Sequence, residues 1–472
     1  MREVDILIHG GRVLTMAPDR HTIADGAIAI ADGRIVDVGE TDRVASAVHA
    51  VKAIDARGRL VLPGLVDVHL HNTQQLSRGL ADDVDLITWV YDRILPYEAC
   101  LNDEDTYLST MLTAIAAIRT GTTCTCDPGG YLVDNVARAY EEVGLRGVVS
   151  WAGMDQWPGD RPVPDALPGK LTTAETLEAM ERVVRTWDGQ ANGRLRACYG
   201  LRTEPNVSPE LFRETKRLAD RDHTFIHMHT AVSQSQVDWM RAHTGYTSIE
   251  YLEHLGVLDG NWLLAHVAAV SGHEVDLLAK RGAKIAHQPG ASLHGAYGVV
   301  SRGRIPEMLE AGITVGLGCD ANSADNSLDM FRAMFLAATV HKEVRGDATL
   351  VSPERALELA TIDGARAIGW DDEIGSLEVG KRADVIVVDM GGANWVPVHD
   401  FSIVPTLVYS GEGSDVLTTI VDGQVLMEGR RLLTVDERAL LDRAQAAAEA
   451  IVDRLPYRLS PRWRASGKSA DS

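Results

Sequence analysis

The apolar positions in the central part of this chain follow two alternating patterns. Short, mostly apolar runs are separated by longer segments in which apolar residues recur every three or four positions. The short runs predict buried parallel strands, and the longer segments predict helices that cover them. The predicted strands are Leu65–His69, Thr122–Cys126, Gly147–Trp151, Arg194–Tyr199, Thr224–His229, Trp262–His266, Ala283–His287 and Thr314–Cys319. The predicted helices include Asp103–Arg119, Leu132–Glu142, Ala174–Arg185, Pro209–Ala219, Glu274–Lys280 and Ser327–His341.

Eight strands that alternate with helices favour an α/β fold, a closed (β/α)8 TIM barrel over residues 59–375. An open, doubly wound sheet is the alternative. The two ends of the chain differ from the centre, because residues 1–58 and 376–435 hold short alternating strands with Asp-Gly hairpin turns. They predict a small, discontinuous β-sandwich domain built from both ends. Residues 436–472 are predicted to form a C-terminal helix and a tail.

The composition narrows the class of protein. The 472 residues are 45% hydrophobic and 24% charged, which is typical of a globular protein. The formal net charge of −21 would repel a phosphate backbone, so we expect no nucleic-acid partner. The absence of a long apolar run predicts no membrane partner. The 5 cysteines are scattered and odd in number, which favours a reducing compartment, and we expect a cytoplasmic location.

The first predicted strand ends in two histidines, His69 and His71. Residues two apart in a strand point to the same face, so both imidazoles project to one side at the carboxyl end of the strand. Neutral imidazole is a ligand for zinc and for iron. Taken alone, the pair has two interpretations: half of a metal site, or two surface histidines.

Three further predicted strands end in residues that can bind a metal or carry a proton. The fifth strand contains His227 and His229, the sixth ends in His266, and the eighth is followed by Asp320. Active sites of (β/α)8 enzymes lie at the carboxyl ends of the strands, so this recurrence favours a metal site. His227 shares a face with His229, and it is either a further ligand or a buried histidine of the barrel interior.

Four motifs resemble those of the amidohydrolase superfamily, in the mononuclear branch of adenosine-derivative and guanine deaminases and s-triazine chloro- and aminohydrolases. The motifs are Pro63-Gly-Leu-Val-Asp-Val-His-Leu-His71, Leu263-Leu-Ala-His266, Gly316-Leu-Gly-Cys-Asp-Ala-Asn-Ser-Ala-Asp-Asn-Ser-Leu328 and Gly375-Ser-Leu-Glu-Val-Gly-Lys-Arg-Ala-Asp384. The resemblance implies one divalent metal ion, Zn²⁺ or Fe²⁺, bound by His69, His71, His229 and Asp320. Binuclear members carry a carboxylated lysine on the fourth strand, and the predicted fourth strand contains no lysine.

The resemblance also implies a hydrolytic mechanism on a small-molecule substrate. The ion would lower the pKa of a bound water, and Asp320 would take the proton and pass it to the leaving group. His266 would orient the hydroxide and stabilise charge on the adduct. The expected reaction replaces an amino or chloro substituent of a small aromatic N-heterocycle, of the purine, pterin or triazine type, with oxygen.

One position departs from the deaminating relatives. Those relatives carry a glutamate three residues after the strand-five histidine, and it protonates the ring of the substrate; here the position is Val232. Either another group donates this proton, or the substrate is a urea, carbamate or amide, whose carbonyl needs no ring protonation. Hydrolysis of such a C–N bond is the alternative function. A third hypothesis is an inactive barrel that serves as a scaffold, and the full set of ligands argues against it.

Five residues are predicted to contact the substrate: Gln74, Trp89, Arg202, His287 and Asn322. Gln74 and Trp89 lie in a long loop that resembles the triazine hydrolases, and an aromatic wall suits a flat ring. Arg202 could contact a carbonyl or carboxylate of the substrate, or pair with an acid such as Glu204. His287 could contact substrate or cap its strand. The resemblance implies a homodimer; the helix 437–454 is a candidate contact, or it packs on its own barrel.

Overall fold

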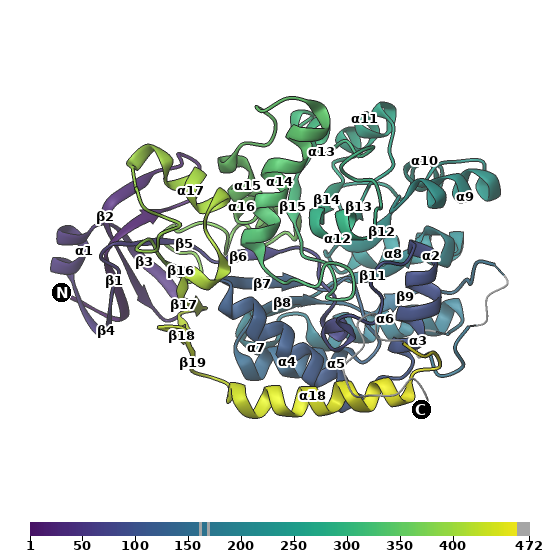
Figure 1. Cartoon of the computed structure of the whole chain (residues 1–472), viewed down its shortest axis with the longest axis horizontal. Helices are drawn as coiled ribbons and strands as arrows, with labels where there is room; N and C mark the ends of the chain where they lie inside the picture. The colour runs from purple at the N-terminus through teal and green to yellow at the C-terminus, as the bar shows by residue number, and fades with distance from the viewer. Residues whose placement is uncertain (160–162, 168–169, 460–472) are drawn as a thin grey trace, which may run out of the picture.

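The computed structural model describes residues 1–159, 163–167 and 170–459 of the chain. A barrel of strands and helices forms the larger body, and a strand-rich part that contains the N-terminus lies beside it (Figure 1). The last described helix, α18, runs along the outside of the barrel. The part of the predicted tail at residues 460–472 lies outside the described residues.

The central strands form a ring of eight parallel positions, as predicted. They are β6 (Leu65–Asp67), β7 (Thr122–Cys126), β8 (Arg146–Val149) with β9 (Ala152–Gly153), β10 (Leu195–Ala197) with β11 (Tyr199–Thr203), β12 (Ile226–Thr230), β13 (Trp262–His266), β14 (Lys284–His287) and β15 (Val315–Leu317). The last strand closes onto the first, because the backbone N–H of Val68 donates to the carbonyl of Leu317 at 2.9 Å and Leu70 forms a parallel bridge with Asp320. The open-sheet alternative is therefore excluded.

Helices cover the outside of this ring. The longer ones are α4 (Asp103–Arg119), α5 (Val133–Val143), α6 (Thr173–Trp187), α8 (Pro209–Arg221), α9 (Gln234–Thr244), α10 (Ser248–His254), α11 (Gly272–Arg281), α14 (Met330–Arg345) and α15 (Pro353–Leu359). Several begin where the sequence supplies a reciprocal capping box, such as Asn102 with Asp105 before α4. α5 ends at Gly144, whose φ of 90° is the left-handed conformation that glycine adopts without strain.

Shorter helical segments connect these elements. They are α1 (Thr41–Ala47), η1 (Asn72–Ser77), α2 (Leu86–Thr88), η2 (Trp89–Ile94), α3 (Leu95–Glu98), α7 (Gln190–Gly193), η3 (Glu204–Asn206), α12 (Pro289–His294), α13 (Ile305–Glu310), α16 (Ile362–Ala367), η4 (Asp400–Ser402), α17 (Ile403–Tyr409) and η5 (Gly413–Asp415). The segment η2 is a π-helix, a form that is frequent at functional sites. It lies in the long loop that follows the first barrel strand.

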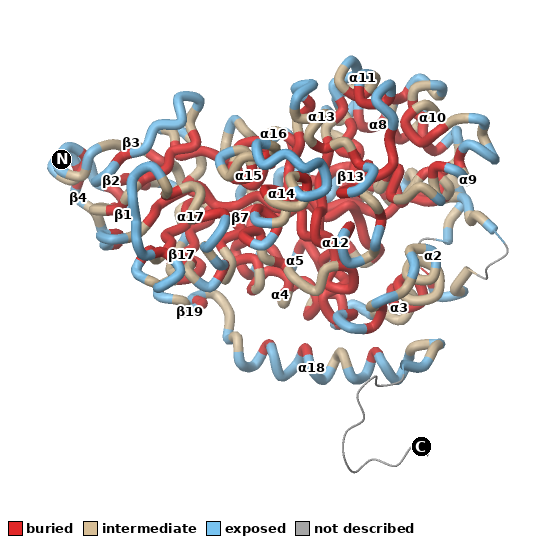
Figure 2. The backbone as a smooth tube through the Cα atoms, turned by 45° about the horizontal axis from the view of Figure 1, so that its top comes forward, coloured by how far each residue is buried: buried red, intermediate tan, exposed pale blue. Residues whose placement is uncertain are grey.

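Alternation along the barrel strands separates two apolar layers. Small residues such as Cys124, Cys126 and Ala265 pack together in one buried cluster with inward-facing valines, whereas Leu264 and Ile285 belong to the larger core against the helices. Figure 2 shows the continuous buried centre that results. Each barrel strand thus has one face toward the interior and one toward the helix layer.

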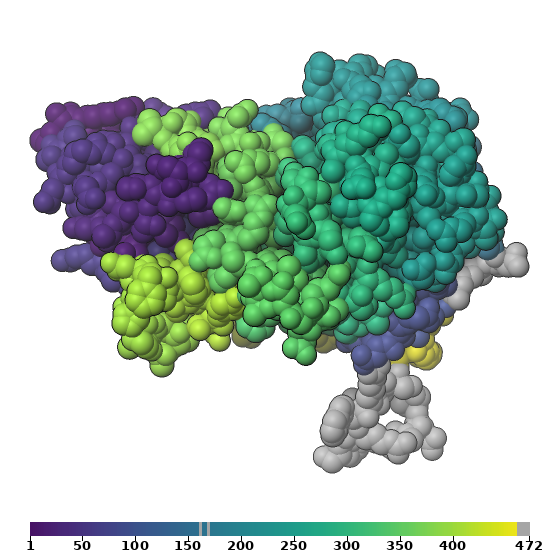
Figure 3. All heavy atoms as spheres, turned by 90° about the horizontal axis from the view of Figure 1, so that it is seen from above, coloured from purple at the N-terminus to yellow at the C-terminus, as the bar shows by residue number. Residues whose placement is uncertain are grey.

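Strands from both ends of the chain pair with each other, as predicted. They are β1 (Arg2–Leu14), β2 (Thr22–Ala31), β3 (Arg34–Glu40), β4 (Val48–Asp55), β5 (Arg59–Pro63), β16 (Val385–Asp389), β17 (Val416–Val421), β18 (Gln424–Glu428) and β19 (Arg431–Leu432). Figure 3 shows the two ends side by side. They form one 9-stranded sheet in which β5 joins β1 to β16, so the predicted two-sheet sandwich is not confirmed. The division at residues 58 and 376 stays a prediction.

A buried ion pair joins the terminal sheet to the barrel. Arg146, in β8, donates through Nε and Nη2 to both carboxylate oxygens of Asp384 at 2.7 and 2.9 Å. Asp384 precedes β16, and its Oδ1 also accepts the backbone N–H of Asp422 at 2.8 Å. The side chain of Arg146 is 0% exposed, so its charge depends on Asp384 and, at 3.5 Å from Nη2, on Asp422 Oδ1.

The C-terminal helix α18 (Glu437–Arg454) packs against its own barrel. Its buried residues Leu440, Ala444 and Ile451 face α4, and Arg454 Nη2 donates to Asp105 Oδ2 at 2.7 Å. This contact accounts for the apolar face of the helix within one chain. Among the described residues, none of the helices combines the length and the apolar run needed to cross a lipid bilayer.

Candidate metal centre

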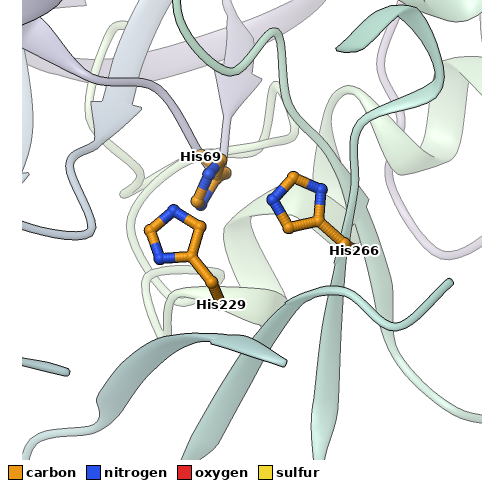
Figure 4. Close-up of side chains that lie close together, drawn as sticks. All are labelled: His69, His229 and His266. Carbon is orange, nitrogen blue, oxygen red and sulfur yellow. The ribbon is translucent and has the colours of Figure 1, made fainter. Parts of the chain in front are cut away.

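Four predicted ligands converge at the carboxyl ends of the barrel strands. The Nε2 atoms of His71 and His229 lie 3.1 Å apart. Asp320 Oδ1 lies 3.6 Å from Nε2 of His69 and 3.6 Å from Nε2 of His71. Figure 4 shows the imidazoles of His69, His229 and His266 turned toward a common space. The structure therefore brings together side chains that are up to about 250 residues apart in sequence, as closure of a barrel requires.

These residues fit a divalent metal ion. Ligand atoms placed tetrahedrally at zinc–nitrogen distances are roughly 3.3 Å apart, close to the separations observed. Nε2 of His69 is buried and has no hydrogen-bond partner among the described residues. Burial lowers the pKa of His69 and His71 well below its usual range and that of His229 to about 4, so the imidazoles are neutral and carry a free lone pair.

Hydrogen bonds behind the ligands select which ring nitrogen is free. His229 Nδ1 donates to the carbonyl of Arg202 at 2.8 Å, which leaves Nε2 with its lone pair toward the centre. His69 Nδ1 faces Nε2 of His227 at 2.9 Å. His227 is therefore a partner of a candidate ligand. In the described part of the chain it is absent from the groups of side chains that could hold an ion.

Strained backbone occurs where the strands deliver these side chains. Asp320 has a φ of 66°, His266 a φ of 71° and Ala231, two residues after His229, a φ of 48°. Left-handed conformations are uncommon for residues other than glycine, and they cluster at functional sites. Here the reversal after each strand turns the side chains toward the space between them. His266 Nε2 lies 3.8 Å from Asp320 Oδ2.

A pocket of about 450 Å³ opens over the centre, a size that accommodates a small heterocyclic molecule. Much of the apolar lining comes from α2 and η2. The apolar lining residues are Leu86, Ile87, Trp89, Val90, Tyr91, Ile94, Pro158, Val232 and Trp239. The polar lining residues are His71, Gln74, Arg202, Thr203, Asn206, His229, Ser235, Gln236, His266, Tyr297 and Asp320. The predicted pocket residues Gln74, Trp89 and Arg202 all line it.

A buried ion pair occupies one side of the pocket. Arg202 Nη2 donates to Glu98 Oε2, and Gln74 Nε2 donates to Glu98 Oε1 at 2.9 Å. Ser323 Oγ in turn donates to Gln74 Oε1 at 2.9 Å. Arg202 is thus an ion-pair partner as well as a pocket residue, and its acid is Glu98 rather than the sequence neighbour Glu204. Because Glu98 balances its charge, this side of the pocket suits an uncharged substrate.

We expect truncation of Trp89 to weaken substrate binding more than the chemical step. Trp89 lines the pocket, and its Nε1 donates to the carbonyl of Ser323 at 2.9 Å. Loss of about 1.5–3 kcal/mol of apolar contact raises KM roughly 10- to 100-fold in Trp89→Ala. Trp89→Phe keeps an aromatic wall but not the N–H, and steady-state kinetics should show a smaller rise. An unchanged KM in Trp89→Ala would remove Trp89 from the binding site.

Two of the predicted substrate contacts, His287 and Asn322, do not line this pocket. His287 alternates with the inward-facing Ala286, so it points to the helix layer, where its Nε2 lies 3.4 Å from Nε2 of His341 on α14. Asn322 is buried outside the pocket lining, and its side-chain amide has no hydrogen-bond partner among the described residues. β15 ends at Leu317 and Asp320 has a left-handed φ, so strand alternation does not extend to Asn322.

The buried pair of His287 and His341 should make the fold sensitive to acid. Burial lowers the pKa of His341 from 6.5 to about 4. Below pH 6.5 the unfolded chain takes up a proton that the folded chain does not, so the free energy of unfolding falls until the pH approaches 4. In His341→Asn, urea unfolding should show a pH dependence flatter by about 1.4 kcal/mol per pH unit in this window. The same slope in both proteins would contradict this.

Sequence reasoning missed two residues of the pocket region. Glu98 was not distinguished from other loop acids, because its partner Arg202 lies on a different strand. Tyr297 lines the pocket, and its ring packs edge-on against His266 at 5.7 Å between centroids. Burial raises the pKa of the Tyr297 phenol, which therefore keeps its proton. The irregular segment that carries Tyr297 has no periodic pattern that could have identified it.

Comparisons with known proteins agree with this geometry. Residues 60–426 match the amidohydrolase family. The chain is 37% identical to 5'-deoxyadenosine deaminase of Methanosarcina acetivorans over 451 residues, which is 95% of this chain and 99% of that protein. It is 35% identical to 5-methylthioadenosine/S-adenosylhomocysteine deaminase of Pelotomaculum thermopropionicum over 450 residues, 95% of this chain and 99% of that protein.

Solved structures share the fold over almost the whole chain. An adenosine deaminase from Xanthomonas campestris with bound zinc has a TM-score of 0.86 and 27% identity, covering 95% of this chain and 99% of its own. Atrazine chlorohydrolase from Arthrobacter aurescens, complexed with zinc, has a TM-score of 0.84 and 24% identity, covering 94% of this chain and 100% of its own. The convergent histidines and aspartate, the barrel that positions them and the match over residues 60–426 make this chain a member of the amidohydrolase family.

Proposed function

We propose that this chain is a metal-dependent aminohydrolase that replaces an amino or chloro substituent of a small aromatic N-heterocycle with oxygen. Adenosine derivatives are the first substrates to test, because relatives that share 35–37% identity over 95% of the chain are deaminases of such nucleosides. The observation that carries the proposal is the convergence of His69, His71, His229 and Asp320 beneath a pocket with an aromatic wall. An inactive scaffold would not need this set of ligands.

The ligand set supports one divalent ion held by His69, His71, His229 and Asp320. Such an ion would supply an activated water at neutral pH. The zinc in the two solved structures makes Zn²⁺ the first metal to test, and Fe²⁺ suits the same nitrogen and carboxylate ligands. Cys126 and Cys198 lie in the barrel interior without taking part in either candidate ligand group.

Asp320 is the residue best placed to move the proton. Its Oδ1 lies 3.6 Å from Nε2 of both His69 and His71, its Oδ2 lies 3.8 Å from Nε2 of His266, and the residue lines the pocket. Oδ2 would take a proton from the attacking water and return it to the leaving amine. In the net reaction, the water oxygen bonds to the ring carbon, the C–N bond breaks, and ammonia leaves with the transferred proton. Burial lowers the pKa of His266 to about 3, so a neutral His266 would orient the water through a hydrogen bond.

Val232 favours a second candidate, hydrolysis of a urea, carbamate or amide. Its side chain lies in the pocket wall and offers no proton to a ring nitrogen. Hydrogen-bond donors among the other pocket residues include Gln74, Arg202 and Tyr297. They can donate to a carbonyl oxygen as readily as to a ring nitrogen. A carbonyl substrate requires no donor at position 232, whereas a purine requires one of these groups to act in its place.

Product masses separate the two candidates. Zinc-reconstituted protein would be incubated with 5'-deoxyadenosine, 5'-methylthioadenosine, guanine, a chlorotriazine, an aryl urea, an aryl carbamate and an anilide. An intact ring with its amine or halide exchanged for oxygen supports the proposal. Cleavage of a urea, carbamate or amide into two fragments, with the heterocycles untouched, would replace it with the second candidate.

Introducing an acid at position 232 tests how the ring of the substrate is protonated. If the chain deaminates a nucleoside without a strong donor at this position, Val232→Glu should raise kcat/KM for that substrate at least about tenfold. The matched variant Val232→Gln has nearly the same shape and cannot release a proton, so it should give no such rise. Equal activity of both variants and the unchanged protein would show that the donor lies elsewhere in the pocket.

A further inference from the structure

His227 lies behind the candidate metal centre and has a partner at each ring nitrogen. Its Nε2 lies 2.9 Å from Nδ1 of His69, and its Nδ1 lies 3.4 Å from the Sγ of Cys126. The side chain is 0% exposed, so water cannot replace either partner. The three residues form a short buried chain that leads from the barrel interior to one of the four candidate ligands.

We propose that His227 is a positioning residue that fixes the tautomer of His69 and so presents Nε2 of His69 to the metal. The proposal rests on the function proposed above only in that His69 is a metal ligand. It assigns His227 a role that is distinct from ligation, and it extends that role to the thiol of Cys126.

The direction of each hydrogen bond follows from counting protons. A neutral imidazole has one N–H and one lone pair, and a ligating nitrogen must hold the lone pair. If Nε2 of His69 ligates, its proton is on Nδ1, which donates to Nε2 of His227. The proton of His227 is then on Nδ1, where the sulfur of Cys126 accepts it.

The opposite arrangement blocks the site. If Nε2 of His227 carried a proton, it would donate to Nδ1 of His69, and the proton of His69 would move to Nε2. That N–H would point toward Asp320 Oδ1, 3.6 Å away, and could not bind a metal. The tautomer of His227 therefore determines whether Nε2 of His69 is free to bind a metal.

His229 offers a comparison within the same centre. Its Nδ1 donates to the carbonyl of Arg202 at 2.8 Å, and a carbonyl can only accept, so its tautomer has a single solution. Nε2 of His227, the partner of His69, can either donate or accept. Which it does depends on the hydrogen bond that His227 makes at its other nitrogen, with Cys126. A thiol sulfur is a weak acceptor, and we expect Cys126 to bias the tautomer less strongly than His227 does.

The geometry does not favour His227 as a ligand itself. Its Nε2 is directed at His69 Nδ1. The side chains whose potential metal-ligating atoms converge are His69, His71, His229, His266 and Asp320. A ligand role and a positioning role make different predictions. Loss of a ligand lowers the number of imidazoles on the metal, whereas loss of a positioning residue lowers the affinity and leaves that number unchanged.

Two amide variants of His227 form a matched pair for the test. In His227→Gln the amide reaches the position of Nε2 and its oxygen can accept from His69. In His227→Asn the amide lies near the position of Nδ1 and leaves His69 Nδ1 without a partner. Zinc affinity would be measured by competition with a chelator in the absence of substrate. We expect His227→Asn to bind zinc about 10- to 100-fold more weakly and His227→Gln to stay within about threefold of the unchanged protein.

A second readout separates positioning from ligation. X-ray absorption of the zinc-loaded variants should give the same number of imidazole ligands as the unchanged protein. Cys126→Ala, which removes only the distal acceptor, should weaken zinc binding less than His227→Asn. Equal affinities of the Asn and Gln variants, one imidazole fewer in either, or no zinc bound by the unchanged protein would each overturn the proposal. Because no substrate is present, a wrong assignment of the reaction would leave this result intact.

Discussion

Asp320→Asn should lower kcat by about 10²- to 10⁴-fold on whichever substrate the chain accepts, because the amide cannot carry a proton from water to the leaving group. The variant keeps an oxygen that can face His69 and His71, so part of the metal affinity should remain. The rate would be measured at saturating zinc, and the bound metal would be determined on the same sample. Loss of the rate with metal still bound assigns the effect to proton transfer.

The same loop supplies a control for Asp320→Asn. Asp325 is also buried, and its Oδ1 lies 3.2 Å from Nη2 of Arg332 rather than in the centre. Asp325→Asn should therefore leave kcat within a few-fold of the unchanged protein. If both variants lost activity equally, the effect would come from a disturbed loop. If Asp320→Asn kept its activity, another group would be the proton carrier.

The second large effect concerns stability. Asp384→Asn should lower the free energy of unfolding by about 3–5 kcal/mol, because it leaves the buried guanidinium of Arg146 with only the longer contact to Asp422, at 3.5 Å, as counter-charge. The pair joins β8 of the barrel to the sheet that contains β16. Urea unfolding and the thermal midpoint would both report the loss. The double variant Arg146→Met with Asp384→Leu should be less destabilised than the sum of the single changes.

A more exposed bidentate pair is the control for Asp384→Asn. Arg43 donates from Nη1 and Nη2 to the two oxygens of Asp37 at 3.0 and 2.8 Å, on the surface. Solvent screens this pair, so Asp37→Asn should change stability far less. Similar losses in the two variants would contradict the argument that burial makes Asp384 important.

Several elements could be predicted from sequence to the residue. The strands Thr122–Cys126 and Trp262–His266 and the helices Asp103–Arg119 and Glu437–Arg454 have the predicted bounds. Each of these segments has a local signal, either an apolar run or a capping side chain, that identifies the residue at which the element begins. The first barrel strand was predicted to end at His69, but β6 ends two residues earlier, at Asp67. The loop begins there although the side chain of His69 still points into the barrel.

The convergence of the candidate ligands could be predicted from the sequence, and the pocket only in part. That these side chains bind a metal stays a prediction. The centre depends on identity and alternation at strand ends, both of which are readable in a sequence. The ion pair of Glu98 with Arg202 joins residues 104 positions apart, and no local pattern records it. The direction of His287 depends on which residues of its strand face the barrel interior and which face the helices. The homodimer and the cytoplasmic location stay predictions, and α18 packs on its own barrel.

If a divalent metal held by His69, His71, His229 and Asp320 drives hydrolysis at an electrophilic carbon, the new oxygen of the product comes from water only when the metal is bound. The most direct test is incubation in ¹⁸O-labelled water, with chelator-treated protein and with the same protein reloaded with zinc or iron, on the substrate found by product mass. We expect product that carries one ¹⁸O only with reloaded protein, and none with His69→Ala treated in the same way. Labelled product at an undiminished rate from metal-free protein would contradict it.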